Sequence, residues 1–465
     1  MKLIMPKIRS SCESETEQLL ADLCDKTFLK LWSYPNPYKN DMKELCDLLV
    51  VFGNHLFIFF DRERVLNKSD KIAPETWIRW KKRVIDKQIK TANGAEKYIS
   101  NKRKIFVDRE CRKPLPISID FENVKIHKII VAHGAKDACL KNSQNNINGS
   151  LAIIYKPIKD TIMPKSLPPF VIYLDNQDPV HVLDTHNLPI ILNELDTVED
   201  FSGYLSAKEY AIKKFRYIMY CGEEDLLADY FSSYDKSIKK YVIGLGCNNN
   251  QGLWIAEGRW NNFTNTNIYK NTKEQNKISY LWDSLIQRTC QNSLDGTLIG
   301  SSNITSGDHA IYYMAKEPRF IRREIMRRFM NAIDKFPDCP PGYVTRHVAF
   351  CPSFFKDVGY IFFQLWIPEL SQTPSSEYIA MRRHMLEIAC GAAKIKFKHL
   401  SKIIGFGMSA VKYSGYTNTE DIVLLECQEW TENETEYYEK ENSHFDFFKT
   451  KRMKKYEDTI TQFTP

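Results

Sequence analysis

The clearest pattern of hydrophobic and polar positions is a pair of apolar runs, LLVVF at 48–52 and LFIFF at 56–60, separated by Gly-Asn-His. Runs rich in β-branched and aromatic residues indicate strands, and a Gly-Asn pair favours a tight turn because both residues tolerate positive φ. We therefore predict a β-hairpin. Asp47 enters its first strand and Asp61 leaves its second, so pairing across the turn would bring both carboxylates to the open end.

This carboxylate pair predicts a metal site. Two carboxylates at the end of buried strands repel each other and lose hydration, so they need hydrogen bonds, protons or a cation. Oxygen ligands of this kind suit Mg²⁺ or Mn²⁺. The alternative is that Asp47 and Asp61 only solvate the strand ends, where charged residues commonly lie.

A helix is predicted before the hairpin, because a Ser-rich start at 10–14 is followed by acidic residues and then by an apolar stripe. The stripe repeats every three or four positions, and extending it backwards reaches Glu17. The Glu17 carboxylate would then point toward the sheet. We expect a short strand at 29–32, between this helix and the hairpin.

A second helix is predicted after the hairpin, from Pro74 to Ile99, with Gln88 interrupting its apolar face. From 77 to 104 the chain has ten Lys or Arg residues and two acids. Such an excess of one sign attracts a phosphate backbone, although a solvated face is the simpler explanation. The candidate nucleic-acid contacts on this helix are Arg79, Lys81, Arg83, Lys87 and Lys90. A strand should follow at 104–108.

A second basic helix is predicted at 318–336, PRFIRREIMRRFMNAIDKF. Its arginines, Arg322 and Arg323 among them, could bind phosphates or could pair with acids of a neighbouring domain. We carry Arg322 and Arg323 as candidate nucleic-acid contacts.

The order of helix, strand, two strands of a hairpin, helix and strand resembles the PD-(D/E)XK, or restriction-endonuclease-like, nuclease superfamily, over about the first quarter of the chain. The resemblance implies an α-β-β-β-α-β core in which Asp47 is the first metal-binding aspartate, preceded by Cys46 where the family has proline. It also implies that Asp61 is the second acid and Glu17 the accessory helix glutamate. Gln88 would match the glutamine that some branches carry on the following helix.

One position departs from the family motif. Two residues past Asp61, where the motif lysine belongs, stands Glu63, which strand alternation places on the same face as Asp61. The lysine is expected to stabilise charge in the phosphoryl-transfer transition state. A lysine of the following helix could replace it; Lys81, Lys82 and Lys87 are the options, and we carry Lys82 as the candidate. Without a replacement, the fold would bind nucleic acid without cleaving it.

Composition narrows the class of protein. The chain has 465 residues, 43% of them hydrophobic, which is enough for two or three domains. Twelve cysteines are spread singly without zinc-finger spacing, and they indicate a reducing, cytoplasmic environment. No apolar run approaches the length of a membrane span, so a membrane partner is not expected. The net charge of +7 is modest, so nucleic-acid affinity should come from local patches.

We predict an α/β protein with α+β elements in four parts. These are a nuclease-like domain at 1–110, a mixed α/β region at 111–220, a mainly helical region at 221–336 and a small α+β domain at 337–465. Residues 111–220 could extend the first sheet or form their own, and the sequence leaves this open.

The expected activity is metal-dependent hydrolysis of phosphodiester bonds by an endo- or exonuclease, with DNA the more favoured substrate over RNA. DNA repair and host defence are settings that fit the resemblance. The alternative is a catalytically inactive subunit that binds nucleic acid or acts as a scaffold. A third possibility is that the charged faces bind protein partners and the resemblance is accidental; an oligomer is compatible with each of these.

Overall fold

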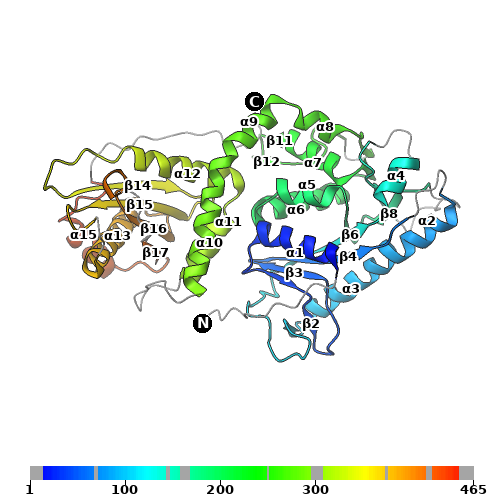
Figure 1. The fold of residues 1–465 in the computed structure, drawn as a ribbon, viewed down its shortest axis with the longest axis horizontal. Helices are drawn as coiled ribbons and strands as arrows, with labels where there is room; N and C mark the ends of the chain where they lie inside the picture. The colour runs from blue at the N-terminus through cyan, green and yellow to red at the C-terminus, as the bar shows by residue number, and fades with distance from the viewer. Residues whose placement is uncertain are drawn as a thin grey trace. The chain divides into compact units, whose positions relative to one another are not determined.

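The computed structural model describes residues 14–66, 72–142, 147–157, 168–248, 251–294, 307–371, 375–414 and 421–449. These residues form several mixed sheets covered by helices, which confirms the predicted mixed α/β, multi-domain class. The chain divides into two compact units, Met1–Thr272 and Lys273–Gln462 (Figure 1).

The first unit contains two larger sheets and their covering helices. Its helices are α1 (Glu15–Phe28), α2 (Pro74–Lys81), the π-helical η1 (Lys82–Asp86), α3 (Lys87–Ser100), α4 (Lys136–Asn142), α5 (Asn187–Glu194), α6 (Val198–Lys214), α7 (Glu223–Ser232) and α8 (Arg259–Thr264), with α9 (Asn267–Asn276) at its end. Its strands are β1 (Ser33–Pro35), β2 (Tyr38–Lys39), β3 (Leu48–Phe52), β4 (His55–Glu63), β5 (Ile105–Phe106), β6 (Lys125–His133), β7 (Ala152–Lys156), β8 (Val171–Asp175), β9 (His181–Asp184), β10 (Ile218–Cys221), β11 (Tyr234–Asp235), β12 (Lys240–Tyr241) and β13 (Leu253–Ile255).

The first sheet has the strand order β1-β3-β4-β6-β9. Its β3 and β4 are the predicted hairpin, paired antiparallel from Phe52 and His55 at the turn to Leu48 and Phe59. Gly53 has φ of 58° in that turn, the positive value that the Gly-Asn pair predicts. In contrast, β4, β6 and β9 run parallel, so their carboxyl ends meet at one edge.

The two faces of this sheet are covered by different helices. On one face, Phe57 of β4 packs against Phe28 of α1 and Phe201 of α6, with ring centroids 5.4 and 5.2 Å apart. On the other, α3 buries Ala92 and Ile99 in a cluster with the alternate residues of β3 and β4. Because side chains alternate along a strand, the odd-numbered residues of β4 face α1 and the even-numbered ones face α3.

The predicted helix after the hairpin is confirmed as α2, η1 and α3, which run on without interruption from Pro74 to Ser100 (Figure 1). Pro74 lies in its first turn, where a missing backbone N–H costs nothing. The indole of Trp80 donates a 2.6 Å hydrogen bond to the carbonyl of Arg64, so the helix is held to the end of β4.

The strand predicted at 29–32 does not form, and the strand predicted at 104–108 forms at 105–106 but lies outside the first sheet. Residues 29–32 follow α1 as a turn, because Leu29 adopts a φ of 65° that no strand allows, and β1 begins only at Ser33. At 104–108 the short β5 pairs with β2 in a separate two-stranded sheet. The strand that joins the first sheet after the helix is β6, which pairs parallel with β4.

Residues 111–220 both extend the first sheet and form part of a second one, the two alternatives that the sequence left open. Their β6 and β9 extend the first sheet, while β7, β8 and β10 join β13 in a second sheet of order β13-β10-β7-β8. The boundary expected near residue 111 therefore falls inside one unit, because the longest strand pairing of the first sheet, between β4 and β6, crosses it.

The second unit is built on a four-stranded sheet of order β14-β15-β16-β17. Its elements after α9 are η2 (Lys277–Ser279), α10 (Tyr280–Leu294), α11 (Gly307–Lys316), α12 (Arg319–Asp334), β14 (Thr345–Pro352), β15 (Val358–Trp366), α13 (Ser376–Lys396), β16 (Lys402–Ser409), α14 (Val411–Ser414), β17 (Asp421–Glu426) and α15 (Glu432–Asn442).

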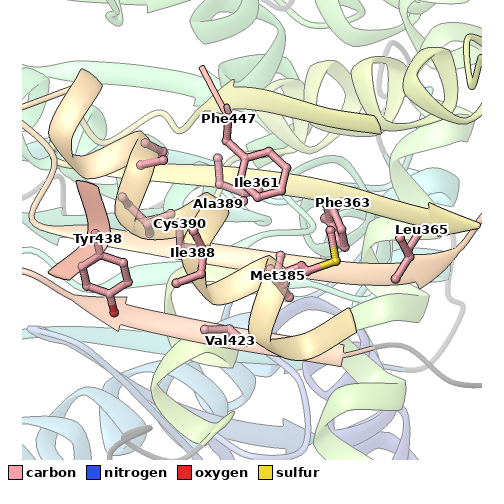
Figure 2. Packing of buried hydrophobic residues seen from close by; sticks show 14 of the residues in the cluster. Ile361, Phe363, Leu365, Met385, Ile388, Ala389, Cys390, Val423, Tyr438 and Phe447 are labelled. Carbon is pink, nitrogen blue, oxygen red and sulfur yellow. The ribbon is translucent and has the colours of Figure 1, made fainter. Parts of the chain in front are cut away.

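One face of this sheet is covered by α13 and α15. Ile361 and Phe363 of β15 lie in one buried cluster with Met385 and Ala389 of α13, and Figure 2 shows these side chains together. The other face is covered by α10 and α12. Phe329 of α12 contacts Phe362 at 4.4 Å between ring centroids. The break expected at 337 is therefore not a domain boundary, because helices on its two sides cover the two faces of one sheet.

Candidate functional site

Polar side chains gather at the edge of the first sheet where the parallel strands β4, β6 and β9 end. Asp61 lies near the end of β4, His133 is the last residue of β6, and Asp184 is the last residue of β9. Asp61 and His133 are buried, with exposed fractions of 4% and 2%. The carboxyl ends of parallel strands are where open α/β sheets most often bind ligands, so this edge is the first place to look for chemistry.

Asp47 and Asp61 meet as the hairpin predicts. Asp47 comes directly before β3, and its Oδ2 accepts a 2.5 Å hydrogen bond from the backbone N–H of Asp61. The backbone N–H of Asp47 in turn donates to the carbonyl of Phe59 at 3.1 Å. The pairing of the two strands therefore fixes the first carboxylate on the backbone of the second acid.

The Asp61 carboxylate is held by both of its oxygens. Oδ1 accepts a 2.8 Å hydrogen bond from the hydroxyl of Thr16, in the first turn of α1. Oδ2 lies 3.1 Å from Nε2 of His133, and the other ring nitrogen of His133 lies 3.1 Å from the hydroxyl of Thr185. Because Thr185 is exposed, this chain of hydrogen bonds connects a buried carboxylate to solvent.

The pKa of Asp47 is raised to about 8. Burial is the main cause, and the nearby negative charges of Glu44, Glu17 and Asp61 add to it, while the hydrogen bond from the Asp61 N–H opposes the shift. The structure thus brings Glu17, Asp47 and Asp61 into electrostatic contact, and we call these three residues the acidic site. Their mutual repulsion is what a bound cation would relieve.

The acidic site offers oxygen donors of the kind that Mg²⁺ binds, two carboxylates with water being a common set. Glu17, Asp47 and Asp61 do not, however, form a group in which three ligand atoms come within 4.8 Å of one another. In the described part of the chain, such a group is formed by His127, His181 and Glu209.

Neither of the two residues predicted to complete the nuclease motif from the following helix contacts the Asp61 carboxylate, whose partners are Thr16 and His133. Gln88 is buried against the opposite face of the sheet, where its amide oxygen accepts from Nη2 and Nε of Arg62 at 3.0 and 2.6 Å. Lys82 is exposed on η1. Glu63 is exposed at the end of β4 and paired in the backbone with His133, so it lies beside the site without being buried in it.

Most of the predicted basic contacts on this helix are available to a ligand. Arg79, Arg83, Lys87 and Lys90 are exposed. Lys81 instead forms an ion pair of 2.6 Å with Asp86, one turn further along the helix.

The predicted phosphate contacts at Arg322 and Arg323 are wrong, because both side chains are buried. Nη1 of Arg322 pairs with Asp283 at 2.7 Å, and its Nε and Nη2 donate to the carbonyls of Glu317 and Ala315. Arg323 donates to Asn276 and to Glu324. The structure therefore agrees with the second alternative given above, in which the arginines pair with acidic side chains of the protein. These acids lie in the same unit as the arginines and not in a neighbouring domain.

His133, Thr16 and Thr185 are not among the site residues that the sequence predicts. The sequence did contain a signal for His133. It directly follows the apolar run IIVA of β6, just as Asp61 directly follows the apolar run of β4. What the sequence could not provide was the parallel pairing of these strands, which places Glu63 opposite His133 and so brings the two strand ends together.

Asp184, at the end of β9, serves as a cap for the element that follows it. Its carboxylate accepts from the backbone N–H groups of Leu151, His186 and Asn187 at 2.9–3.0 Å. It therefore fixes the start of α5, the ordinary role of an acid at a strand exit.

No helix within the described ranges is both long enough and apolar enough to span a bilayer. No family model, curated protein or solved structure matches the chain, so the acidic site is described from its geometry alone.

Proposed function

We propose that this protein is a metal-dependent nuclease that uses the acidic site to hydrolyse phosphodiester bonds, with DNA the favoured substrate and Mg²⁺ or Mn²⁺ as the cofactor. The observation that carries the proposal is the 2.5 Å hydrogen bond from the Asp61 N–H to Asp47. It fixes the Asp47 carboxylate on the backbone of Asp61, where burial and the charges of neighbouring acids, Glu17 among them, make the ionisation of Asp47 unfavourable without a cation. The resemblance of this part of the chain to PD-(D/E)XK nucleases agrees with the same assignment.

The roles of the residues follow from their contacts. Asp47 and Asp61 would hold the ion, which when bound acidifies a water molecule and offsets charge on the phosphate. Thr16 and His133 orient the Asp61 carboxylate, so a metal ligand would be preorganised by two hydrogen bonds. The exposed basic residues of the helix from Pro74 to Ser100 would bind the phosphate backbone without reading bases.

A second candidate function is nucleic-acid binding without cleavage. It is favoured by Glu63, an exposed acid at the position of the motif lysine. An acid at this position would add negative charge beside the phosphate of the substrate, whereas a cation is needed there to stabilise the transition state. The exposed Lys82 is the residue proposed to supply that cation, and Lys81 and Lys87 are the alternatives.

The test is cleavage of labelled single- and double-stranded DNA and RNA with Mg²⁺, Mn²⁺ or EDTA, for wild type, Asp47→Asn and Asp61→Asn. The nuclease proposal expects metal-dependent cleavage that both substitutions abolish, with binding of the substrate retained. Binding that is sensitive to salt but never followed by cleavage in the wild type would favour the second function. Cleavage that survives in both variants would overturn the assignment of the acidic site.

A further inference from the structure

A second group of potential metal ligands lies at the opposite, amino edge of the same parallel strands. His127 is the third residue of β6, His181 is the first residue of β9, and Glu209 projects from α6. One ligand atom from each lies within 4.8 Å of the other two. His127 pairs with Phe57 of β4, four residues before Asp61, so this group and Asp61 are about 13 Å apart along the sheet.

The distances within the group match those between ligands of one ion. Nδ1 of His127 lies 2.8 Å from Oε1 of Glu209, and Nε2 of His181 lies 3.2 Å from the same oxygen. Ligand atoms about 2.0 Å from a tetrahedral Zn²⁺ lie about 3.3 Å from one another. A small rotation of the side chains would therefore place all three atoms around one ion.

The ring nitrogens that face Glu209 are the ones that would bind the ion. Nδ1 of His127 and Nε2 of His181 share Oε1 of Glu209 as their partner, so an ion bound between them would replace these two hydrogen bonds. Each ring would then carry its proton on the other nitrogen, the tautomer that leaves the facing nitrogen free to coordinate a metal.

The surrounding contacts are those of outer-shell partners. Nε2 of His127, the nitrogen turned away from Glu209, lies 3.1 Å from Nδ1 of His55, which would orient the His127 ring. The second oxygen of Glu209 lies 2.9 Å from Nζ of Lys125. The Glu209 side chain is 13% exposed whereas those of the histidines are buried, so an ion would enter from the side of α6.

We propose that His127, His181 and Glu209 form a binding site for a divalent transition-metal ion, with Zn²⁺ the best match. Two imidazole nitrogens and one carboxylate oxygen suit zinc, whereas Mg²⁺ prefers oxygen ligands alone. The ion would link β6 and β9 to α6 and so stabilise the face that α6 covers. The site is independent of the proposed nuclease function, since it shares no residue with the acidic site.

The test is metal content and thermal stability of the full chain, stripped with a chelator and reloaded with ZnCl₂ or MgCl₂. Wild type should retain zinc through gel filtration at one ion per chain and unfold at a higher temperature with zinc than without. Glu209→Gln and His181→Asn should lose both effects, and His55→Gln should weaken zinc binding by about tenfold. The matched control is the double variant Asp47→Asn and Asp61→Asn, which should bind zinc as wild type does.

A second measurement avoids substitutions in the buried core. Co²⁺ added to the stripped wild type should give the intense visible absorption of a tetrahedral site, and equimolar Zn²⁺ should abolish it. Failure of the wild type to take up zinc or cobalt would overturn the proposal and leave the three residues as a hydrogen-bonded network. Uptake that persists undiminished in Glu209→Gln and His181→Asn would also overturn it, because the ion would then lie elsewhere.

Discussion

The backbone N–H of Asp61 positions the carboxylate of Asp47 through a hydrogen bond of 2.5 Å. The pKa of Asp47 nevertheless rises to about 8, because the carboxylate is largely removed from water and three other acids, Glu44, Glu17 and Asp61, lie near it. The fold thus contains a carboxylate whose ionisation it resists at neutral pH. A structure retains such a group at a cost in stability, which a bound ligand can repay.

The first prediction concerns Asp47→Asn in EDTA. The folded-state pKa lies above the ordinary value of 3.8, so Asp47 contributes stability in full below about pH 4 and loses it as the pH rises toward 8. Asparagine keeps an acceptor for the Asp61 N–H and cannot ionise. We expect the variant to be more stable than wild type at pH 8.5, by on the order of a few kcal/mol, and the difference to shrink or reverse at pH 4.

Urea unfolding at several pH values, with the buffer free of divalent ions, measures this difference. Glu122→Gln is a matched control, because Glu122 is an exposed acid of the same unit and its removal should leave the pH dependence unchanged. A variant whose stability runs parallel to that of wild type across the pH range would show that Asp47 is not the strained carboxylate.

The second prediction concerns Thr16→Val, which removes the hydroxyl that donates to Oδ1 of Asp61 at 2.8 Å. Valine keeps the shape of threonine, so the helix should fold, but the Asp61 carboxylate, a proposed metal ligand, would lose one of its two orienting partners. We expect the Mg²⁺ concentration for half-maximal cleavage to rise by about tenfold, with near-normal activity at saturating metal. Thr91→Val, on an exposed turn of α3, is the control. A lower maximal rate with an unchanged metal requirement would contradict a positioning role.

The hairpin could be predicted because its information is local. Two apolar runs around Gly53 and Asn54 determine both the turn and the register, and the register determines that Asp47 meets Asp61. The helix from Pro74 to Ser100 was predictable for the same reason, since its apolar period and its first-turn proline lie within one segment. Periodicity and turn chemistry suffice where the partners are close in sequence.

The parts that escaped prediction depend on partners far away in the chain. His133 lies 72 residues from Asp61, and only the parallel pairing of β4 with β6 brings them together. The burial of Arg322 likewise depends on Asp283, 39 residues earlier, because a basic helix looks the same in sequence whether its cations face solvent or a buried acid. The cluster of His127, His181 and Glu209 comes from three elements, and no spacing rule links them.

The third prediction concerns the exposed basic face of the helix from Pro74 to Ser100. Replacing Lys87 and Lys90 by glutamine removes two cations without touching the buried side. If they contact phosphates, binding should weaken for all sequences alike, and the slope of log K against log salt should fall by about one for each residue. The measurement is fluorescence anisotropy of a labelled DNA over a salt series.

Lys236→Gln with Lys240→Gln is a control of equal charge change, because both lysines are exposed in the same unit but outside this helix. The control should bind as wild type does. An equal loss of affinity in both double variants would mean that net charge alone, and not this face, attracts the nucleic acid.

The fourth prediction concerns Asp283, whose carboxylate pairs with both Arg319 and Arg322 at 2.8 and 2.7 Å. The two arginine side chains are nearly inaccessible, at 3% and 4% exposure, so Asp283→Ala leaves two buried cations without their acid. Removing one partner of a buried pair costs about 3–5 kcal/mol. We expect the free energy of unfolding of the second unit to fall by this amount, as measured by urea titration with circular dichroism. The control is Glu274→Ala, which breaks an exposed pair with Lys277 and should cost less than about 1 kcal/mol. An Asp283 variant as stable as wild type would contradict the view that Arg319 and Arg322 are buried cations that need this acid.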